Sequence, residues 1–326
     1  MKKIYDEMLR LFAKQGEVIF ATEIAPDCGR KYLADEFVSL GLQAAAFTRF
    51  PKLVSCGEKK FFVEQLTGAP EMVIAGGGHV ALEVANIAKI LGFVVTVVDE
   101  RGEFANRERF KTADRVLCED IAAGLQRSAG TNAYYVIVTR GHKDDLRALE
   151  TVLAKKYRYV GMIGSKAKVA FAMEQLLEKG YSAEVLGTVH APIGLAIGAI
   201  TPAEIAVSIL AEIIQELNRG VNDKQQVAIL QEIAAASEPM AMVTIIEKKG
   251  SSPRGVGSKM LVTASGRIIG TIGGGMIEHR AAAEAAEIAA GGGAVIRDYD
   301  LSLQDASQLG MACGGTVKVL LECMER

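Results

Sequence analysis

Cysteine is scarce in this sequence of 326 residues, and its five copies form no paired motif. They stand apart, at Cys28, Cys56, Cys118, Cys313 and Cys323. An odd number without a Cys-x-x-Cys spacing argues against a disulfide framework and against a structural zinc site. Such cysteine usage is typical of a reducing compartment, and we expect a cytoplasmic protein.

Long apolar runs and a strong charge of one sign are also missing. No run reaches the roughly 18 apolar residues that a membrane-spanning helix needs, and residues 1–7 lack the apolar core of a signal peptide. The net charge is −2, and no basic stripe is interleaved with aromatic residues. We therefore expect neither a membrane segment nor a nucleic-acid partner.

Catalytic signatures are equally sparse. The four histidines form no pair at helical spacing, and there is no nucleophile elbow and no cluster of acids. His142 with Asp144 and Asp145 is a candidate proton-transfer pair, although acids in the first turn of a helix explain the same residues. The sequence predicts no catalytic set and leaves enzymatic activity open.

The most informative stretch that is present runs from Met72 to Asp99. An apolar run ends in glycines, a segment with helical spacing follows, and a β-branched run then ends at Asp99, as in a parallel crossover unit. The glycines fit a phosphate-binding turn, in which Gly76 permits the tight turn and Gly78 lets a pyrophosphate approach the backbone. Asp99 lies where a carboxylate accepts a hydrogen bond from a ribose 2′-hydroxyl.

Other residues are expected near the same place. His79 occupies the first turn of the predicted helix, where it either packs against the turn or contacts the ligand. Two later predicted strands end at residues 139–142 and at Gly164 and Ser165. Because ligands of open α/β sheets bind beyond the carboxyl ends of the strands, we expect all these ends to share one crevice.

The length predicts two domains and a smaller segment. We place a small helix–strand segment at residues 1–70, a Rossmann-like doubly wound parallel sheet at 71–222, and a smaller α+β domain at 223–326. The fold class is therefore α/β.

The first segment echoes the last domain. Residues 1–22 and 225–244 both read as a helix followed by a strand that ends in threonine, and residues 61–66 parallel residues 316–321. Residues 1–70 are thus a candidate degenerate copy of the C-terminal domain that has lost its glycine loops. The alternative is chance, since helix–strand units are common.

Three loops of the C-terminal domain differ from ordinary connections. Residues 251–254 offer two hydroxyls and a guanidinium, and residues 271–275 present backbone N–H groups at a helix start, where anions bind. Residues 310–315 hold Cys313 between glycines. Together they predict a pocket for an anionic ligand with a soft metal or sulfur centre. Tight turns around a buried structural cysteine are the alternative.

Seven motifs occur collinearly within the two domains: residues 77–80, 98–106, 159–165, 190–194, 250–260, 271–275 and 310–315. With them the chain resembles the XdhC/CoxI family, accessory proteins of xanthine dehydrogenase and related molybdenum hydroxylases. Two departures stand out. The order of the domains is reversed, and Met276 follows the glycine triplet where the family often has a cysteine. The role of that thiol then falls to Cys313 or is altered.

The resemblance implies a maturation chaperone rather than a turnover enzyme. Such a protein binds molybdenum cofactor (molybdopterin), protects it while a cysteine desulfurase supplies its sulfido ligand, and delivers it to the apo-enzyme of a xanthine dehydrogenase-like hydroxylase. The nucleotide-type motif alone supports an alternative, an NAD(P)-dependent oxidoreductase with NAD(P) or another nucleotide as cofactor. A scaffold that only docks the hydroxylase is a third reading.

We expect cofactor-binding residues in both domains, and the resemblance adds those of the second. They are Gly76, Gly78, His79, Asp99, Gly164, Ser165, Ser252, Arg254, Gly273, Gly274, Gly275 and Cys313. Arg254 and the glycine triplet suit the phosphate of the cofactor, and no metal ligand is assigned. A homodimer is expected, because exchange of domains between partners would accommodate the reversed domain order.

Overall fold

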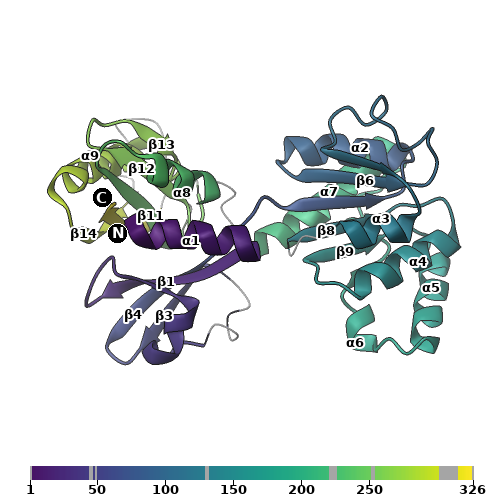
Figure 1. Cartoon of the computed structure of the whole chain (residues 1–326), viewed down its shortest axis with the longest axis horizontal. Helices are drawn as coiled ribbons and strands as arrows, with labels where there is room; N and C mark the ends of the chain where they lie inside the picture. The colour runs from purple at the N-terminus through teal and green to yellow at the C-terminus, as the bar shows by residue number, and fades with distance from the viewer. Residues whose placement is uncertain are drawn as a thin grey trace. The chain divides into compact units, whose positions relative to one another are not determined.

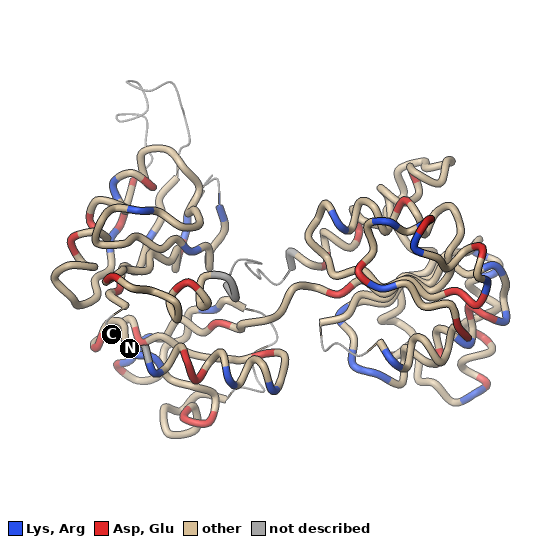
Figure 2. Tube along the Cα trace, turned by 45° about the horizontal axis from the view of Figure 1, so that its top comes forward, with Lys and Arg blue, Asp and Glu red and all other residues tan. Residues whose placement is uncertain are grey.

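The chain forms two compact units. The computed structural model describes residues 2–43, 47, 50–128, 132–219, 226–250, 254–300 and 315–324. One unit combines Met1–Gly68 with Arg219–Arg326, and the other is Ala69–Asn218 (Figure 1). The N-terminal segment therefore belongs to the same unit as the C-terminal domain. Within the described ranges, no helix is both long and apolar enough to cross a membrane. Acidic and basic positions are interspersed in both units (Figure 2).

The unit Ala69–Asn218 is built on a six-stranded parallel sheet with the order β10-β9-β8-β5-β6-β7. This confirms the predicted Rossmann-like doubly wound fold. Its strands are β5 (Glu71–Ala75), β6 (Val94–Asp99), β7 (Arg115–Cys118), β8 (Ala133–Ile137), β9 (Tyr159–Met162) and β10 (Val189–His190). Its helices are α2 (His79–Ile90), α3 (Ile121–Arg127), α4 (His142–Leu153), α5 (Lys166–Glu178), α6 (Ala183–Leu186) and α7 (Pro202–Arg219).

Alternating side chains of the strands fill two cores, one on each face of this sheet. Met72 and Ile74 of β5 pack with α2 and α7 on one face. Val73 and Ala75 pack with α3, α4 and α5 on the other. Successive side chains of a strand point to opposite faces, so a continuous apolar run is what a sheet covered on both sides requires.

The strand order reverses beside β5. The chain moves from β5 to β6 on one side and returns to β8 on the other. Helix α2 begins just after β5, and helix α4 begins soon after β8. In doubly wound sheets the ligand crevice lies at such a switch point, beyond the carboxyl ends of the strands.

The other unit contains two antiparallel sheets with the orders β2-β1-β4-β3 and β13-β12-β11-β15-β14. The first sheet comprises β1 (Glu17–Ala25), β2 (Lys31–Leu33), β3 (Lys52–Cys56) and β4 (Lys59–Thr67). The second comprises β11 (Met240–Gly250), β12 (Lys259–Thr263), β13 (Ile268–Gly270), β14 (Ala294–Asp300) and β15 (Gly315–Cys323). The helices are α1 (Lys2–Gln15), α8 (Gln226–Ala235), α9 (Gly275–Gly291) and the 3-10 helix η1 (Ala34–Leu40).

Helix packing explains how this unit holds together. Helix α9 buries Ile277, Ala281, Ala285 and Ala289, a spacing of four that gives one apolar stripe against the second sheet. Helices α1 and α8 pack together and share one core with strands of both sheets (Figure 1). The connection between β1 and β4 contains β2, η1 and β3.

Candidate functional site

Two glycines of the turn after β5 differ in their surroundings: Gly76 is closely packed, whereas Gly78 faces open space. A Cβ atom on Gly76, which has φ 108°, would lie 2.4 Å from the carbonyl oxygen of Val138 beyond β8. Gly78 precedes α2 in an extended conformation, and a Cβ placed on it would meet no heavy atom within 4 Å. His79 is exposed at the start of the helix. A ligand can therefore reach the backbone at Gly78, while Gly76 is fixed by the strand beside it.

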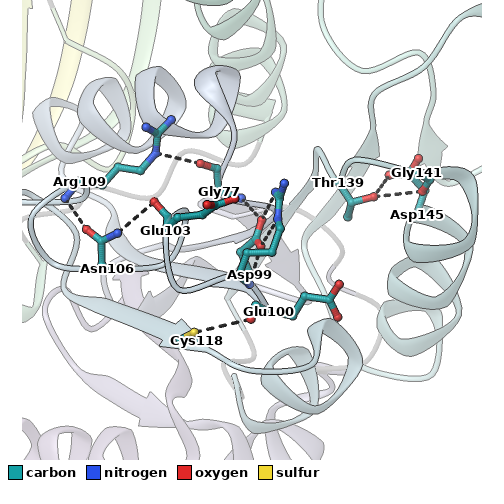
Figure 3. A network of polar contacts seen from close by, with 11 residues as sticks. Gly77, Asp99, Glu100, Glu103, Asn106, Arg109, Cys118, Thr139, Gly141 and Asp145 are labelled. Carbon is teal, nitrogen blue, oxygen red and sulfur yellow. Dashed lines mark hydrogen bonds and ion pairs between the residues drawn. The ribbon is translucent and has the colours of Figure 1, made fainter.

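Asp99 is committed to protein partners (Figure 3). Its Oδ2 accepts hydrogen bonds from the backbone N–H of Gly77 at 2.7 Å and from the Arg101 guanidinium at 2.8 Å. Its Oδ1 accepts from the backbone N–H and the Nε of Arg101 at 3.0 and 2.9 Å. Because the residue is only 3% exposed, a sugar hydroxyl would have to displace one of these donors. The role expected for Asp99 at a ribose stays a prediction.

The protonation of Asp99 follows from the same contacts. Burial alone would raise the pKa of its carboxyl, but the hydrogen bonds from Arg101 and from the N–H of Gly77 outweigh burial and lower it. Asp99 is therefore a carboxylate at neutral pH, and it ties the glycine turn to the connection after β6.

That connection closes over Gly77. A Cβ atom on Gly77 would lie 2.4 Å from the carbonyl oxygen of Phe104. Arg109 donates from Nε to the carbonyl oxygen of Gly77 at 3.0 Å, and the Arg101 guanidinium lies 3.9 Å from the centre of the Phe104 ring. Two guanidinium groups thus flank the turn. Neither arginine is among the residues expected at the site, although Arg101 lies within the 98–106 motif.

On the other side of the crevice, polar contacts connect the start of α4 with the start of α5. Thr139 donates to Asp145 at 2.6 Å (Figure 3). Asp145, which is 1% exposed, also forms an ion pair with Lys168. Ser165 caps α5 by accepting from the N–H of Lys168 at 3.3 Å, and the Lys168 side chain lies over Gly164. The predicted residues Gly164 and Ser165 are therefore held close to the end of β8 by an ion pair whose carboxylate is buried.

A cavity of about 760 Å³ lies between the first turns of these two helices. His142 and Ser165 line it at the helix starts, and Lys143 and Lys168 give it positive charge. Phe171 is 53% exposed at its rim, with its ring edge-on to His142. The cavity thus has lysine and aromatic side chains in its lining, and the ammonium of Lys168 is paired with Asp145.

A third polar cluster contains residues that the sequence did not single out as a site. Glu212 of α7 accepts from the Tyr159 hydroxyl at 2.6 Å and from the Gly194 N–H at 2.9 Å, and its other oxygen lies 3.2 Å from Nδ1 of His190. Burial and then the bond to Glu212 raise the pKa of Tyr159 far above its usual value. The 159–165 and 190–194 motifs contain Tyr159, His190 and Gly194, whereas no motif contains their partner Glu212, which lies on a separate helix.

The glycine turn of the C-terminal domain is capped from within the chain. Oε2 of Glu278 accepts from the Thr271 hydroxyl at 2.5 Å, from the Ile272 N–H at 3.1 Å and from the Gly274 N–H at 3.0 Å. Burial opposes ionisation of Glu278, but the bonds from Thr271 and the turn outweigh it and lower its pKa. A carboxylate of the protein thus occupies the anion position expected at this turn, and a phosphate there would compete with Glu278.

The remaining predicted residues are less defined. Gly273, Gly274 and Gly275 have φ of 127°, 76° and 70°, which favours glycine at each position. Arg254 is exposed. Ser252 and Cys313 lie outside the described residues. In the ranges that are described, no three His, Cys, Asp or Glu side chains gather in a way that could hold a metal ion.

Two family models match the chain. The model described as the XdhC Rossmann domain covers residues 72–213, and the model described as the XdhC and CoxI family covers residues 233–300. The chain belongs to the XdhC and CoxI family. The resemblance read from the motifs is therefore confirmed for both domains, including the order in which this family member carries them.

Known proteins similar to this XdhC and CoxI family member align with part of it. Escherichia coli YqeB is 34% identical over 163 residues, which are 50% of this chain and 30% of that protein. A Bacillus subtilis protein, named as a probable subunit of xanthine dehydrogenase, is 29% identical over 161 residues, 48% of this chain and 46% of that one. A crystal structure described as a xanthine dehydrogenase from Bacillus halodurans aligns with 69% of this chain and 66% of its own, at 20% identity and a TM-score of 0.46. The chain thus spans less than half the length of the two sequence relatives.

Proposed function

We propose that this protein is an accessory factor in the maturation of a xanthine dehydrogenase-like molybdenum hydroxylase. It binds molybdenum cofactor, holds it while a cysteine desulfurase supplies sulfur, and passes it to the apo-hydroxylase. The observation that carries the proposal is that both domains of the XdhC and CoxI family stand in one chain, over residues 72–213 and 233–300. The name of the Bacillus subtilis relative supports the choice of partner.

The residues at the crevice of the Rossmann-like unit suit a phosphorylated cofactor. The open backbone at Gly78 and the start of α2 offer N–H groups to a phosphate. Arg101 and Arg109 add positive charge beside the same turn, and the cavity at Phe171 offers space for a ring. When bound, the cofactor would bring its own molybdenum centre, so that the protein need only bind and shield it.

The experiment is purification without oxygen, followed by measurement of pterin and molybdenum and by activation of a partner apo-hydroxylase. Arg254→Ala should weaken cofactor binding, by roughly 10- to 150-fold, because a charged hydrogen-bond partner contributes about 1.5–3 kcal/mol. Cys313→Ser should retain the cofactor but impair sulfuration or transfer, since a thiolate is the sulfur acceptor. If both variants bind and activate like the wild type, the assignment of these loops is wrong.

A second candidate is an NAD(P)-dependent oxidoreductase, favoured by the glycine turn at Gly76 and Gly78 with Asp99 at the end of β6. Titration calorimetry with NAD(H), NADP(H), ATP and molybdenum cofactor separates the candidates. Heat from a nicotinamide cofactor together with hydride transfer would favour the oxidoreductase. Heat from the molybdenum cofactor alone would favour the accessory factor. A homodimer remains a proposal, which light scattering at micromolar concentration tests.

A further inference from the structure

The two sheets of the unit that combines residues 1–68 with the C-terminal domain share one plan. In each, a central strand pairs with a shorter antiparallel strand on one side and a long one on the other, and a further strand pairs with the long one: β2-β1-β4-β3 and β12-β11-β15-β14. The second sheet has one strand more, β13, beside β12. Both central strands carry an irregularity at the same place, after Glu23 in β1 and after Ile245 in β11.

Backbone hydrogen bonds beside these irregularities also match. The N–H of Glu23 donates to the carbonyl of Arg30, and the carbonyl of Glu23 accepts from the N–H of Gly29, at 2.7 and 2.9 Å. In the second sheet the N–H of Ile245 donates to Ser258, and its carbonyl accepts from the N–H of Gly257, at 3.0 and 2.7 Å. The segment that leads into β2 therefore makes the same backbone hydrogen bonds to β1 as the segment that leads into β12 makes to β11.

Three polar residues occupy equivalent positions in each sheet. Thr22, one residue before the irregularity of β1, matches Thr244 of β11. Lys31 opens β2 as Lys259 opens β12. The register then equates Glu64 with Glu322, because Phe20 faces Glu64 and Met242 faces Glu322. These positions come from strand pairing alone and do not depend on the contacts of the side chains.

The contacts of these residues cross between the two sheets reciprocally. Lys31 donates to Thr22 of its own sheet at 3.0 Å and forms an ion pair with Glu322 of the other sheet at 2.8 Å. Lys259 donates to Thr244 at 3.1 Å and pairs with Glu64 at 2.8 Å. The four charged side chains are at most 5% exposed. A buried charge is tolerated only with a partner and further hydrogen bonds, so each sheet depends on the other.

Two close approaches of glycine to the opposite sheet are also equivalent in the two copies. A Cβ on Gly29 would lie 2.7 Å from Cβ of Ala294, the first residue of β14. A Cβ on Gly257 would lie 3.0 Å from Pro51, the residue before β3. One core joins the sheets through equivalent pairs: Val18 and Met240, Phe20 and Met242, Leu33 and Leu261, and Leu66 and Met324.

We infer that residues 1–68 are a second copy of the C-terminal fold, packed on it as one subunit of a twofold dimer packs on the other. The self-complementary exchange of Lys and Glu is what an isologous interface produces, here within one chain. The C-terminal copy alone keeps the long glycine loop: Lys259 follows Thr244 by fifteen residues, whereas Lys31 follows Thr22 by nine.

The second copy therefore acts as a built-in partner of that loop. Residues 254–258 lead into Lys259, which pairs with Glu64 of the second copy, and Gly257 lies against Pro51 of the same copy. Glu64 is thus a positioning residue for the segment that carries Arg254. Glu322 makes the same bond to Lys31, but on the short loop that lacks the motif, so it is a matched control.

The test compares Glu64→Gln with Glu322→Gln in the full chain by hydrogen exchange. We expect the Gly257 and Ser258 amides to exchange roughly tenfold faster or more in Glu64→Gln only, and those of Gly29 and Arg30 in Glu322→Gln only, since each variant removes one charged hydrogen-bond partner. Both variants should lower the unfolding temperature by similar amounts. If both variants loosen the same loop, or neither loosens any, the inference is overturned.

Two arms keep this result separate from the proposed function. If a glutamine variant does not fold, Glu64→Asp and Glu322→Asp replace the pair, because they keep the charge but shorten the side chain. Glu64→Asp must then speed exchange only at Gly257 and Ser258, and Glu322→Asp only at Gly29 and Arg30. The expected effect on ligand rests on the proposed function: Glu64→Gln should retain less pterin than Glu322→Gln. A wild-type chain without pterin would count against the proposed function, and the exchange pattern would still decide the inference.

Discussion

The N–H of Gly77 donates a 2.7 Å hydrogen bond to the carboxylate of Asp99, which lies at the end of the neighbouring strand. The same carboxylate is held by three donors of Arg101. The acid that a nucleotide-binding pattern assigns to a sugar thus fixes the glycine turn from inside the protein. Removal of Asp99 should therefore affect folding as well as binding.

Asp99→Asn should lower the free energy of unfolding by about 1.5–3 kcal/mol, because the amide loses a charge-assisted bond and turns an N–H toward another donor. Urea unfolding measures the change. Asp298→Asn is the control, because its side chain is 73% exposed in an ion pair, and it should shift stability by no more than about 0.5 kcal/mol. Equal effects in both variants would contradict the role of Asp99.

Acid should weaken the glycine turn that Glu278 caps. Its pKa is lowered in the folded chain from a usual value of 4.5, so the folded state binds fewer protons than the unfolded chain in acid. The stabilisation is complete above the usual value and is lost as the pH falls through the lowered one. Glu278→Gln should be less stable at neutral pH and lose less stability between about pH 5 and about pH 3 than the wild type. A wild-type slope that the variant does not reduce would contradict this.

Neighbouring glycines should respond in opposite ways. Gly77→Ala places a methyl group 2.4 Å from the Phe104 carbonyl oxygen and should destabilise by about 1–3 kcal/mol, as overpacking does. Gly78→Ala meets open space and should leave the unfolding temperature nearly unchanged while weakening binding of a phosphorylated ligand. Thermal unfolding with calorimetry measures both. If Gly78→Ala binds as tightly as the wild type, the ligand does not approach this backbone.

The Tyr159–Glu212 pair should show energetic coupling. Glu212→Gln weakens the acceptor of a buried hydroxyl, so a double-mutant cycle with Tyr159→Phe should give a coupling of about 1 kcal/mol or more. A Tyr157→Phe and Thr188→Val cycle is the control, since that hydroxyl pair is exposed, and its coupling should be near zero. Equal coupling in the two cycles would show that Glu212 has no special role.

Local patterns predicted the parts of the fold that depend on local physics. The run from Met72 to Asp99 indicated strand, glycine turn, helix and strand because burial on both faces and a tight turn leave composition signals. The capping of Gly274 by Glu278 could have been suspected from their spacing of four, but glycine turns alone point equally to an external anion.

Long-range polar partners could not be predicted in this way. Lys31 and Glu322 are 291 residues apart in the sequence. Nothing in the residues around either one distinguishes a buried, paired charge from an exposed one. Arg101 and Arg109 were likewise not predicted at the site, because only the folded connection after β6 brings them to Gly77 and Asp99. The similar helix–strand patterns of residues 1–22 and 225–244 suggested a duplication. The reciprocal Lys–Glu pairs between the two copies could be recognised only once the register of the strands was known.

The most direct measurement of the central proposal is the pterin and molybdenum content of the wild-type chain after anaerobic purification from cells that make the cofactor. The proposed function predicts both in a fixed ratio, together with activation of an apo-hydroxylase when the loaded protein is added. A folded chain that holds neither, and that does not take up free cofactor in calorimetry, would contradict it.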